Sequence, residues 1–380
     1  MIRRLALLLL ALHLLPSAEA QDRRNVSLKL EVKRAIERGA EYLLGQQDKE
    51  GWWSDAKYPA LTALPLTALH GHPDDKYRKN PTPGMHKGYA HLLSTQREDG
   101  GFYVEGYANY NTAVTMMGLL TAGRTEFDAP LRVARGYLVG LQNDLGVKGK
   151  LDTPYDGGIG YGRRYPHSDL NNSLLALEAI YHTRHLVADA SGSHKELDWK
   201  AAISFLQNCQ NLPSHNKGTN VANDAANLGG FHYYPGFSQA GNVTNSLTGR
   251  VSLRSYGSAS YAGLLSYIYA DLKSTDPRVI AVVDWLGDNY TLKENPGMGQ
   301  QGLYYYYQLI TKALTTANVG QLTAKDGSKI NWRVDLTRRI LNLQKTNGSW
   351  ANENNRWWET DPVLVTSYCV IALEMLYPKL

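Results

Sequence analysis

The sequence predicts an all-α fold, an α/α toroid in which six outer helices surround six inner helices. Three observations lead to this prediction. A motif of Gln, Gly and an aromatic residue recurs along the chain, the segment before each copy is amphipathic, and the segment after it is apolar on most sides. Because a helix that is apolar all round must be buried, the alternation of these two kinds of helix predicts two concentric rings.

The first 20 residues have the features of a signal peptide. Basic residues precede an apolar run at 5–15, and Ala18-Glu19-Ala20 offers a cleavage site between small residues. We therefore expect a secreted or periplasmic protein whose single toroid domain spans residues 21–380. No later segment approaches the roughly 20 apolar residues of a membrane-spanning helix. This predicts that no transmembrane anchor remains after signal cleavage.

Three copies of the repeat agree closely. Each has Gln, a polar residue three positions later, Gly four positions later and an aromatic residue six positions later; they are Gln47–Trp53, Gln96–Phe102 and Gln344–Trp350. Weaker copies lie between them, at Gln142 with an insert before Gly157, at Gln207 before Gly229, and from Asp276 to Tyr304. A period of roughly 45 to 65 residues is typical of stacked helical repeats.

Each repeat predicts a pair of helices joined by the motif. Apolar residues before the first motif recur every three or four positions, which is the spacing of one helix face, and a glycine follows as a helix cap. The inner helices are expected at residues 61–69, 112–120, 174–181, 261–269, 304–314 and 363–376. We expect the motif Gln, Asp or Asn to accept hydrogen bonds from free N–H groups where an inner helix starts. The motif residues are therefore interpreted as structural.

The pattern basic-Gly-x-x-aromatic-Leu-x-x-x-Gln-x-x-x-Gly-x-Trp resembles the QW repeat of squalene–hopene and oxidosqualene cyclases, and more loosely that of protein prenyltransferase β subunits. The resemblance covers almost all of the mature chain. Residues 168–173, 257–263, 295–304 and 361–362 are more similar to exported bacterial prenyltransferase/squalene oxidase repeat proteins. The resemblance implies a terpenoid cyclase/prenyltransferase-like toroid with an isoprenoid or other amphipathic ligand in its central cavity.

The chain lacks the catalytic motifs of those relatives. The D-x-D-D acid is missing, and its nearest approach is His72-Pro73-Asp74-Asp75 in a polar loop. Neither Cys209 nor Cys369 has the Asp two residues earlier that the zinc motif of prenyltransferases requires. We therefore predict no metal and no cofactor, and leave open whether the protein is an enzyme. The two cysteines can form a disulfide or remain as buried thiols.

Candidate site residues lie where the inner helices are expected to begin. If these helices run parallel, their positive N-terminal ends gather at one mouth of the cavity. Asp169 and Asp361 are the candidate catalytic carboxylates, as acid and base, and the alternative is that both only cap helices. The candidate ligand-binding residues are polar or aromatic: Tyr110, Asn111, Arg163, Asn171, Asn172, Ser260, Tyr261, Tyr304, Tyr307 and Trp357.

Three functions remain open. The first is an exported terpene cyclase- or prenyltransferase-like protein that binds or converts an isoprenoid or amphipathic ligand; the many tyrosines favour an amphipathic one. The second is a polysaccharide-active lyase or hydrolase, with Asp169, Asp361 and Arg163 in a carbohydrate cleft. The third is a non-catalytic binding or scaffold module. Positive charge is spread along the chain, which predicts no nucleic-acid partner. Glu178, His182 and His185 share one helix face, but such a stripe is more typical of a solvated helix end than of a zinc site.

Overall fold

The computed structural model describes residues 18–162, 167–188 and 195–380. Residues 1–17 of the predicted signal peptide and the candidate ligand-binding residue Arg163 lie outside these ranges. The described residues form thirteen α-helices and a few short strands, which confirms the predicted all-α class.

Twelve of the helices alternate between two kinds. The first kind lies directly before a copy of the repeat motif or, for α10, before the joint that takes the place of the motif. These helices are α1 (Ala18–Gly45), α4 (Pro83–Ser94), α6 (Asp128–Gly140), α8 (Trp199–Asn208), α10 (Pro277–Asp288) and α12 (Trp332–Leu343). Those that follow the motif or this joint are α2 (Ala60–His70), α5 (Ala108–Thr121), α7 (Leu170–His182), α9 (Gly257–Tyr269), α11 (Leu303–Thr316) and α13 (Pro362–Leu376). All six expected inner segments are helical, and each helix starts between one and four residues before the expected position.

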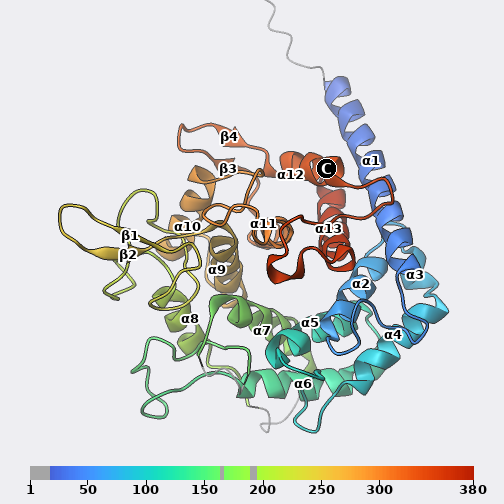
Figure 1. Cartoon of the computed structure of the whole chain (residues 1–380), viewed down its shortest axis with the longest axis horizontal. Helices are drawn as coiled ribbons and strands as arrows, with labels where there is room; N and C mark the ends of the chain where they lie inside the picture. Colours follow the sequence, from blue (N-terminus) through green and yellow to red (C-terminus); the bar gives the residue numbers. More distant parts are fainter. Residues whose placement is uncertain (1–17, 163–166, 189–194) are drawn as a thin grey trace, which may run out of the picture.

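Each helix that follows a motif contacts the next helix of the same kind, and these contacts form a closed cycle. Helix α2 contacts α5, α5 contacts α7, and the contacts continue through α9, α11 and α13 back to α2. Figure 1 shows these helices around the centre, with α1, α4, α6, α8, α10 and α12 outside them. We call the two sets inner and outer helices. Burial follows the same division, since twelve residues of α9 are buried but only four of α12.

The motif glutamine fastens one outer helix to the next. Gln47 Nε2 donates to the carbonyl of Gly51 in its own turn and to that of Gly84 in α4, both at 2.8 Å. Gln96, Gln142, Gln210 and Gln344 make the same pair of bonds to their own turn and to the next outer helix or its cap.

These bonds correct two details of the sequence prediction. The glutamine side-chain nitrogen donates to backbone carbonyls, and the side chain does not accept from inner-helix N–H groups. The reason is that a carbonyl of the motif turn and a carbonyl of the next outer helix both need a donor at this joint. In the fourth repeat the glutamine in this role is Gln210, since Gln207 instead accepts from Arg278 of α10.

The motif aromatic residue and glycine complete the turn. The indole of Trp53 donates to the Leu43 carbonyl at 2.6 Å, and the Trp53 backbone N–H donates to the Thr62 hydroxyl of α2 at 3.2 Å. Gly51 has a φ of 104°, and a Cβ there would lie 2.5 Å from Lys87 of α4. Only glycine fits both the left-handed backbone and this close approach.

The ring closes where the last motif meets α1. Gln344, in the last motif, donates to the Ala35 carbonyl of α1 at 2.9 Å. Arg38 of α1 donates to the carbonyls of Lys345 and Thr346 at 2.8 and 2.9 Å. The joint after α10, which lacks the glutamine, is held differently: the Tyr306 phenol of α11 donates to the Thr291 carbonyl at 2.9 Å.

Smaller elements decorate the connections. The antiparallel pairs β1 (Asn242–Thr244) with β2 (Val251–Leu253), and β3 (Leu322–Thr323) with β4 (Lys329–Ile330), were not expected from the sequence. The remaining short helices are α3 (Lys76–Lys79), η1 (Thr125–Phe127), η2 (Arg184–Leu186), η3 (Arg356–Trp358) and η4 (Tyr377–Lys379). Within the described ranges, no helix has the length and apolar character to cross a bilayer. Cys209 and Cys369 are both buried free thiols.

Candidate functional site at the mouth of the ring

Hydrogen bonds bring the N-terminal ends of neighbouring inner helices together. The Asn111 side chain of α5 accepts from the N–H of Ala60, the first residue of α2, at 3.3 Å. Asn109 of α5 donates to the backbone carbonyl of Asn172 in α7 at 2.9 Å. Since both bonds join first turns, these helix starts lie at the same end of the ring, which we call the mouth.

The other half of the ring is connected in the same way. The Asn295 side chain, which precedes α11, accepts from the Ser258 N–H in the first turn of α9 at 2.9 Å. Glu359, which precedes α13, accepts from the Tyr305 N–H in the first turn of α11 at 2.8 Å. Glu359 was not among the predicted site residues, and only its position just before an inner helix hinted at a capping role.

Asp169 is the buried acid of the mouth. It caps α7, and its side chain accepts from the Asn172 N–H at 2.9 Å and from the Asn172 side-chain amide at 2.7 Å. The side chain is fully buried, and this burial raises the pKa of Asp169 to about 6 even though both hydrogen bonds favour the ionised form. The carboxyl can therefore hold or release a proton near neutral pH.

Three tyrosines lie near this carboxyl, and the Tyr233 side chain hydrogen-bonds to it. Burial, followed by the charge of Asp169, raises the pKa of Tyr161 and of Tyr233. The same two causes act on Tyr256, which directly precedes α9. The phenolic oxygens of Tyr161 and Tyr233 lie 3.5 Å apart. The sequence marked Tyr233 only as part of an aromatic cluster with Tyr234, and it did not place any of the three tyrosines beside Asp169, because each lies in a connection between helices.

Aromatic side chains also reach into the interior from opposite helices. Tyr110 of α5 hydrogen-bonds Tyr368 of α13, and the Tyr305 ring of α11 lies 6.0 Å from the Tyr368 ring. Burial, and then the proximity of Tyr110, raises the pKa of Tyr305. Because α5 and α11 are three places apart in the cycle, these side chains meet across the ring.

An ion pair between a buried glutamate and a half-buried lysine joins two inner helices further from the mouth. Lys312 Nζ of α11 lies 2.5 and 2.6 Å from the two carboxylate oxygens of Glu178 in α7, and the Tyr269 phenol of α9 donates to the same carboxylate at 3.1 Å. Glu178 is therefore occupied, and the His185 ring bonds the His182 carbonyl instead. In the described ranges, no three His, Cys, Asp or Glu side chains are placed to hold a metal ion.

The second candidate acid, Asp361, caps a helix. Its side chain accepts from the Val363 N–H at 2.8 Å at the start of α13. Among the described residues no hydrogen bond or ion pair joins Asp361 to Asp169. The Asp361 side chain thus caps α13 as the Asp169 side chain caps α7.

Several candidate ligand-binding residues are held by the fold itself. Asn111 caps α2, and Asn172 holds Asp169. The Ser260 hydroxyl accepts from the Phe231 N–H and donates to the Tyr256 carbonyl, at 3.0 and 2.9 Å. The Tyr304 and Tyr307 side chains are buried, and the Tyr307 phenol donates to a carbonyl and accepts from Arg339 of α12.

Other candidates keep free polar groups or exposed rings. The Asn171 side-chain oxygen and the Tyr261 phenol are buried, and neither has a hydrogen-bond partner among the described residues. The Trp357 ring is 42% exposed, and Arg356 stacks over it with its guanidinium carbon 5.1 Å from the ring centre.

An exposed aromatic cluster forms the rim of the mouth. Trp358, before α13, lies 4.8 Å from the Tyr58 ring before α2, and Tyr107 lies 6.1 Å from Tyr58 and 5.5 Å from Tyr161. Tyr107 and Trp358 are about two-fifths exposed and have positive φ angles of 43° and 62°. Aromatic residues rarely adopt this backbone, and such outliers concentrate at functional sites.

Comparison with known proteins identifies the fold. No protein-family model matches the chain, and no curated protein matches its sequence. A ligand-free variant of the type II terpene cyclase MstE from Scytonema superposes with a TM-score of 0.58 and 13% identity, over 93% of this chain and 99% of that chain. A variant of MstE in complex with its substrate geranylgeranyl dihydroxybenzoate covers the same shares, with a TM-score of 0.54 and 11% identity. At this identity the likeness shows a terpene cyclase-like fold.

Proposed function

We propose that this chain is an exported α/α toroid of six outer and six inner helices that binds or converts an isoprenoid or other amphipathic ligand inside the ring. Asp169 is the proposed acid. The observation that carries the proposal is that a fully buried carboxyl with a pKa of about 6 lies among tyrosines at the mouth. The terpene cyclase-like fold supports the isoprenoid class, because a variant of MstE is in complex with its substrate geranylgeranyl dihydroxybenzoate.

The proposed chemistry is proton transfer to an electron-rich double bond. The O–H bond of protonated Asp169 breaks, a C–H bond forms on the ligand, and a carbocation remains while Asp169 becomes a carboxylate. The faces of Tyr161 and Tyr233 stabilise the cation through their ring quadrupoles. Loss of a proton from the cyclised ligand restores the acid, so no cofactor is consumed.

The polar groups of the interior favour an amphipathic ligand over a pure hydrocarbon. At the start of α7, Asn171 offers a buried amide oxygen without a partner among the described residues, and the Glu178–Lys312 pair lies further along the same helix. A hydroxyl on the ligand would donate to the Asn171 amide oxygen, since leaving a buried acceptor without a donor is costly.

A carbohydrate ligand is the second candidate. The exposed rim of Tyr58, Tyr107 and Trp358 favours it, because flat aromatic faces stack on sugar rings. Binding of a sugar at the rim would not depend on Asp169. Asp169→Asn would therefore leave carbohydrate binding unchanged, which distinguishes this candidate from the first.

The test is turnover of a prenylated probe. We expect the mature protein to convert geranylgeranyl dihydroxybenzoate into an isomer of the same mass with a different chromatographic retention, and Asp169→Asn to reduce that conversion at least 100-fold. Asp361→Asn serves as the matched control, since Asp361 also caps an inner helix. Equal conversion by Asp169→Asn and the unchanged protein would refute the acid role, provided that circular dichroism shows both folded.

Export is tested separately. Expression of residues 1–380 in a secreting bacterial host should yield extracytoplasmic protein that begins at Gln21 by intact mass. Protein that keeps residues 1–20 and remains in the cytoplasm would contradict the proposed localisation.

A further inference from the structure

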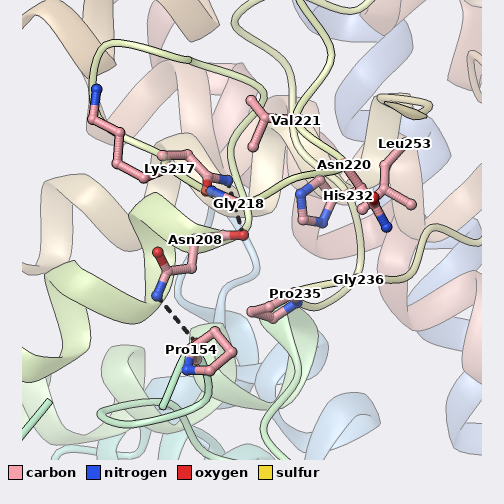
Figure 2. Close-up of a pocket in the computed structure, with 11 residues that line it drawn as sticks. Pro154, Asn208, Lys217, Gly218, Asn220, Val221, His232, Pro235, Gly236 and Leu253 are labelled. Carbon is pink, nitrogen blue, oxygen red and sulfur yellow. Dashed lines mark hydrogen bonds between the residues drawn. The ribbon is translucent and has the colours of Figure 1, made fainter. Parts of the chain in front are cut away.

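A pocket of about 270 Å³ lies outside the ring, where the segment after α8 folds over the segment 232–236. Figure 2 shows its wall, with Asn208 at the end of α8, Pro154 and Pro235 below it, and His232 beside Asn220. This volume lies near the lower limit for small-molecule sites, and it suits one small ring-sized ligand.

His232 presents one unused nitrogen in this pocket. The side chain is 1% exposed, and its Nδ1 lies 3.1 Å from the Tyr234 carbonyl oxygen. Because a carbonyl can only accept, Nδ1 carries the proton and Nε2 is an acceptor. Nε2 has no hydrogen-bond partner among the described residues. Burial lowers the pKa of His232 to about 4, so the ring is neutral and Nε2 stays an acceptor.

Two amides on the pocket wall also have unused groups. The Asn208 amide nitrogen donates to the Pro154 carbonyl at 3.2 Å, so its oxygen is free to accept. The Asn220 side-chain oxygen accepts from Thr219 at 3.2 Å, so its nitrogen is free to donate. The pocket therefore offers two acceptors and one donor, all of them uncharged.

The only charged side chain on the wall is committed elsewhere. Lys217 Nζ donates to the carbonyls of Pro213 and Ser214 at 2.8 and 3.1 Å, and Figure 2 shows it directed away from His232. The apolar wall consists of Val221, Leu253 and the two prolines. Unpaired charge on a ligand would have no partner here, whereas C–H groups would pack against Val221 and Leu253.

We propose that this pocket is a second binding site, for a neutral, hydroxyl-rich ligand the size of a monosaccharide. Two hydroxyl groups donate to His232 Nε2 and Asn208 Oδ1, a third oxygen accepts from Asn220 Nδ2, and the ring face packs on the apolar wall. The site is separate from the ring interior, because His232 faces the pocket while its neighbour Tyr233 lies beside Asp169.

D-glucose is the probe for the test. Adding it to the 15N-histidine-labelled protein should produce a saturable change in the chemical shift of His232 Nε2, and saturation-transfer NMR should detect the bound sugar. Inorganic phosphate, an anion, should produce neither effect. An unchanged Nε2 shift at a glucose concentration of about 100 mM, far above a millimolar dissociation constant, would overturn the proposal, and so would a response to phosphate alone.

Variants test the individual contacts. His232→Phe should abolish the saturation-transfer signal, and Asn208→Ala, at a partly exposed position, should weaken glucose binding about tenfold. The control is His86→Ala, which changes an exposed histidine on α4. If His232→Phe does not fold, Asn208→Ala decides the question, and binding equal to that of the unchanged protein would contradict the assignment. Asp169 plays no part in this test, so its outcome is independent of the proposed function.

Discussion

Asp169 and His232 are both buried, and burial shifts their pKa values in opposite directions. Burial disfavours the charged form of each, so the carboxyl pKa rises to about 6 and the imidazole pKa falls to about 4. Each group consequently makes folding pH-dependent, but with opposite sign.

The Asp169 contribution to stability should fall as the pH rises. Between about pH 4 and pH 6 the folded protein binds the proton that an unfolded Asp has lost, so the contribution is complete below pH 4 and lost above pH 6. A shift of two pKa units corresponds to about 3 kcal/mol. Denaturant unfolding at pH 4, 5, 6 and 7 should show that Asp169→Asn removes this loss. An identical pH profile in the variant would contradict the raised pKa.

The His232 contribution should rise with pH. Between about pH 4 and pH 6.5 the unfolded chain binds a proton that the folded His232 does not, so stability is lost as the pH falls. The shift corresponds to about 3 kcal/mol. NMR titration of the His232 ring should give a midpoint near pH 4, and a midpoint at an ordinary histidine value would mean that the ring is solvated.

At the level of single elements, the glutamine bonds between outer helices explain why the motif recurs. Each motif glutamine satisfies one carbonyl in its own turn and one in the next outer helix. The repeat is therefore a joint between neighbouring units, which agrees with its structural interpretation.

Removing one such joint should have a measurable cost. Gln344→Leu leaves the Gly348 and Ala35 carbonyls without their donor, and we expect the free energy of unfolding to fall by roughly 1–3 kcal/mol. Gln46→Leu, an exposed glutamine at the end of α1, is the matched control and should change stability by less than about 0.5 kcal/mol. Equal effects in urea unfolding would show that the two hydrogen bonds do not matter.

The contact between α1 and α13 depends on a missing side chain. A Cβ at Gly39 would lie 2.6 Å from Val370 Cγ2 and 3.2 Å from the Trp350 ring, whereas a Cβ at Gly45 meets nothing within 4 Å. We expect overpacking in Gly39→Ala to reduce the free energy of unfolding by about 1–3 kcal/mol and so to lower the melting temperature. Gly45→Ala should leave the melting temperature unchanged or raise it slightly. A melting temperature that rises equally in both variants would mean that α1 can move away from α13 at no cost.

In the molecule as a whole, the inner ring is stabilised across its interior as well as around its circumference. Glu178 and Lys312 come from α7 and α11, which do not adjoin in the cycle, and Lys312 is the more exposed partner. Breaking the pair should therefore lower the stability of the whole inner ring and not of one helix alone.

A double-mutant cycle tests this pair. Lys312→Met leaves the Glu178 carboxylate buried without its cation and should cost up to about 3 kcal/mol, while adding Glu178→Leu should recover part of that loss. Urea unfolding of the two single variants and the double variant gives the coupling energy. Strictly additive effects would show that the two charges do not interact.

The sequence alone determined the helices and their order. The spacing of apolar residues at three and four positions, together with the apolar character of the second helix of each pair, identified all six inner segments. This works because the buried face of an α-helix is set by residues close together in the sequence. It also predicted the turns, since the glycine at Gly51 meets a local backbone requirement.

Only the tertiary structure decided which side chains meet. Glu178 and Lys312 are 134 residues apart, and Tyr233 reaches Asp169 from a connection with no helical pattern, so local spacing could not pair them. The shifted pKa values of Asp169 and His232 depend on burial by distant segments, which no motif records. Asp169 and Asp361 both cap inner helices and look equivalent in the sequence, but Asp169 is fully buried whereas Asp361 is half-buried, because different segments pack around them.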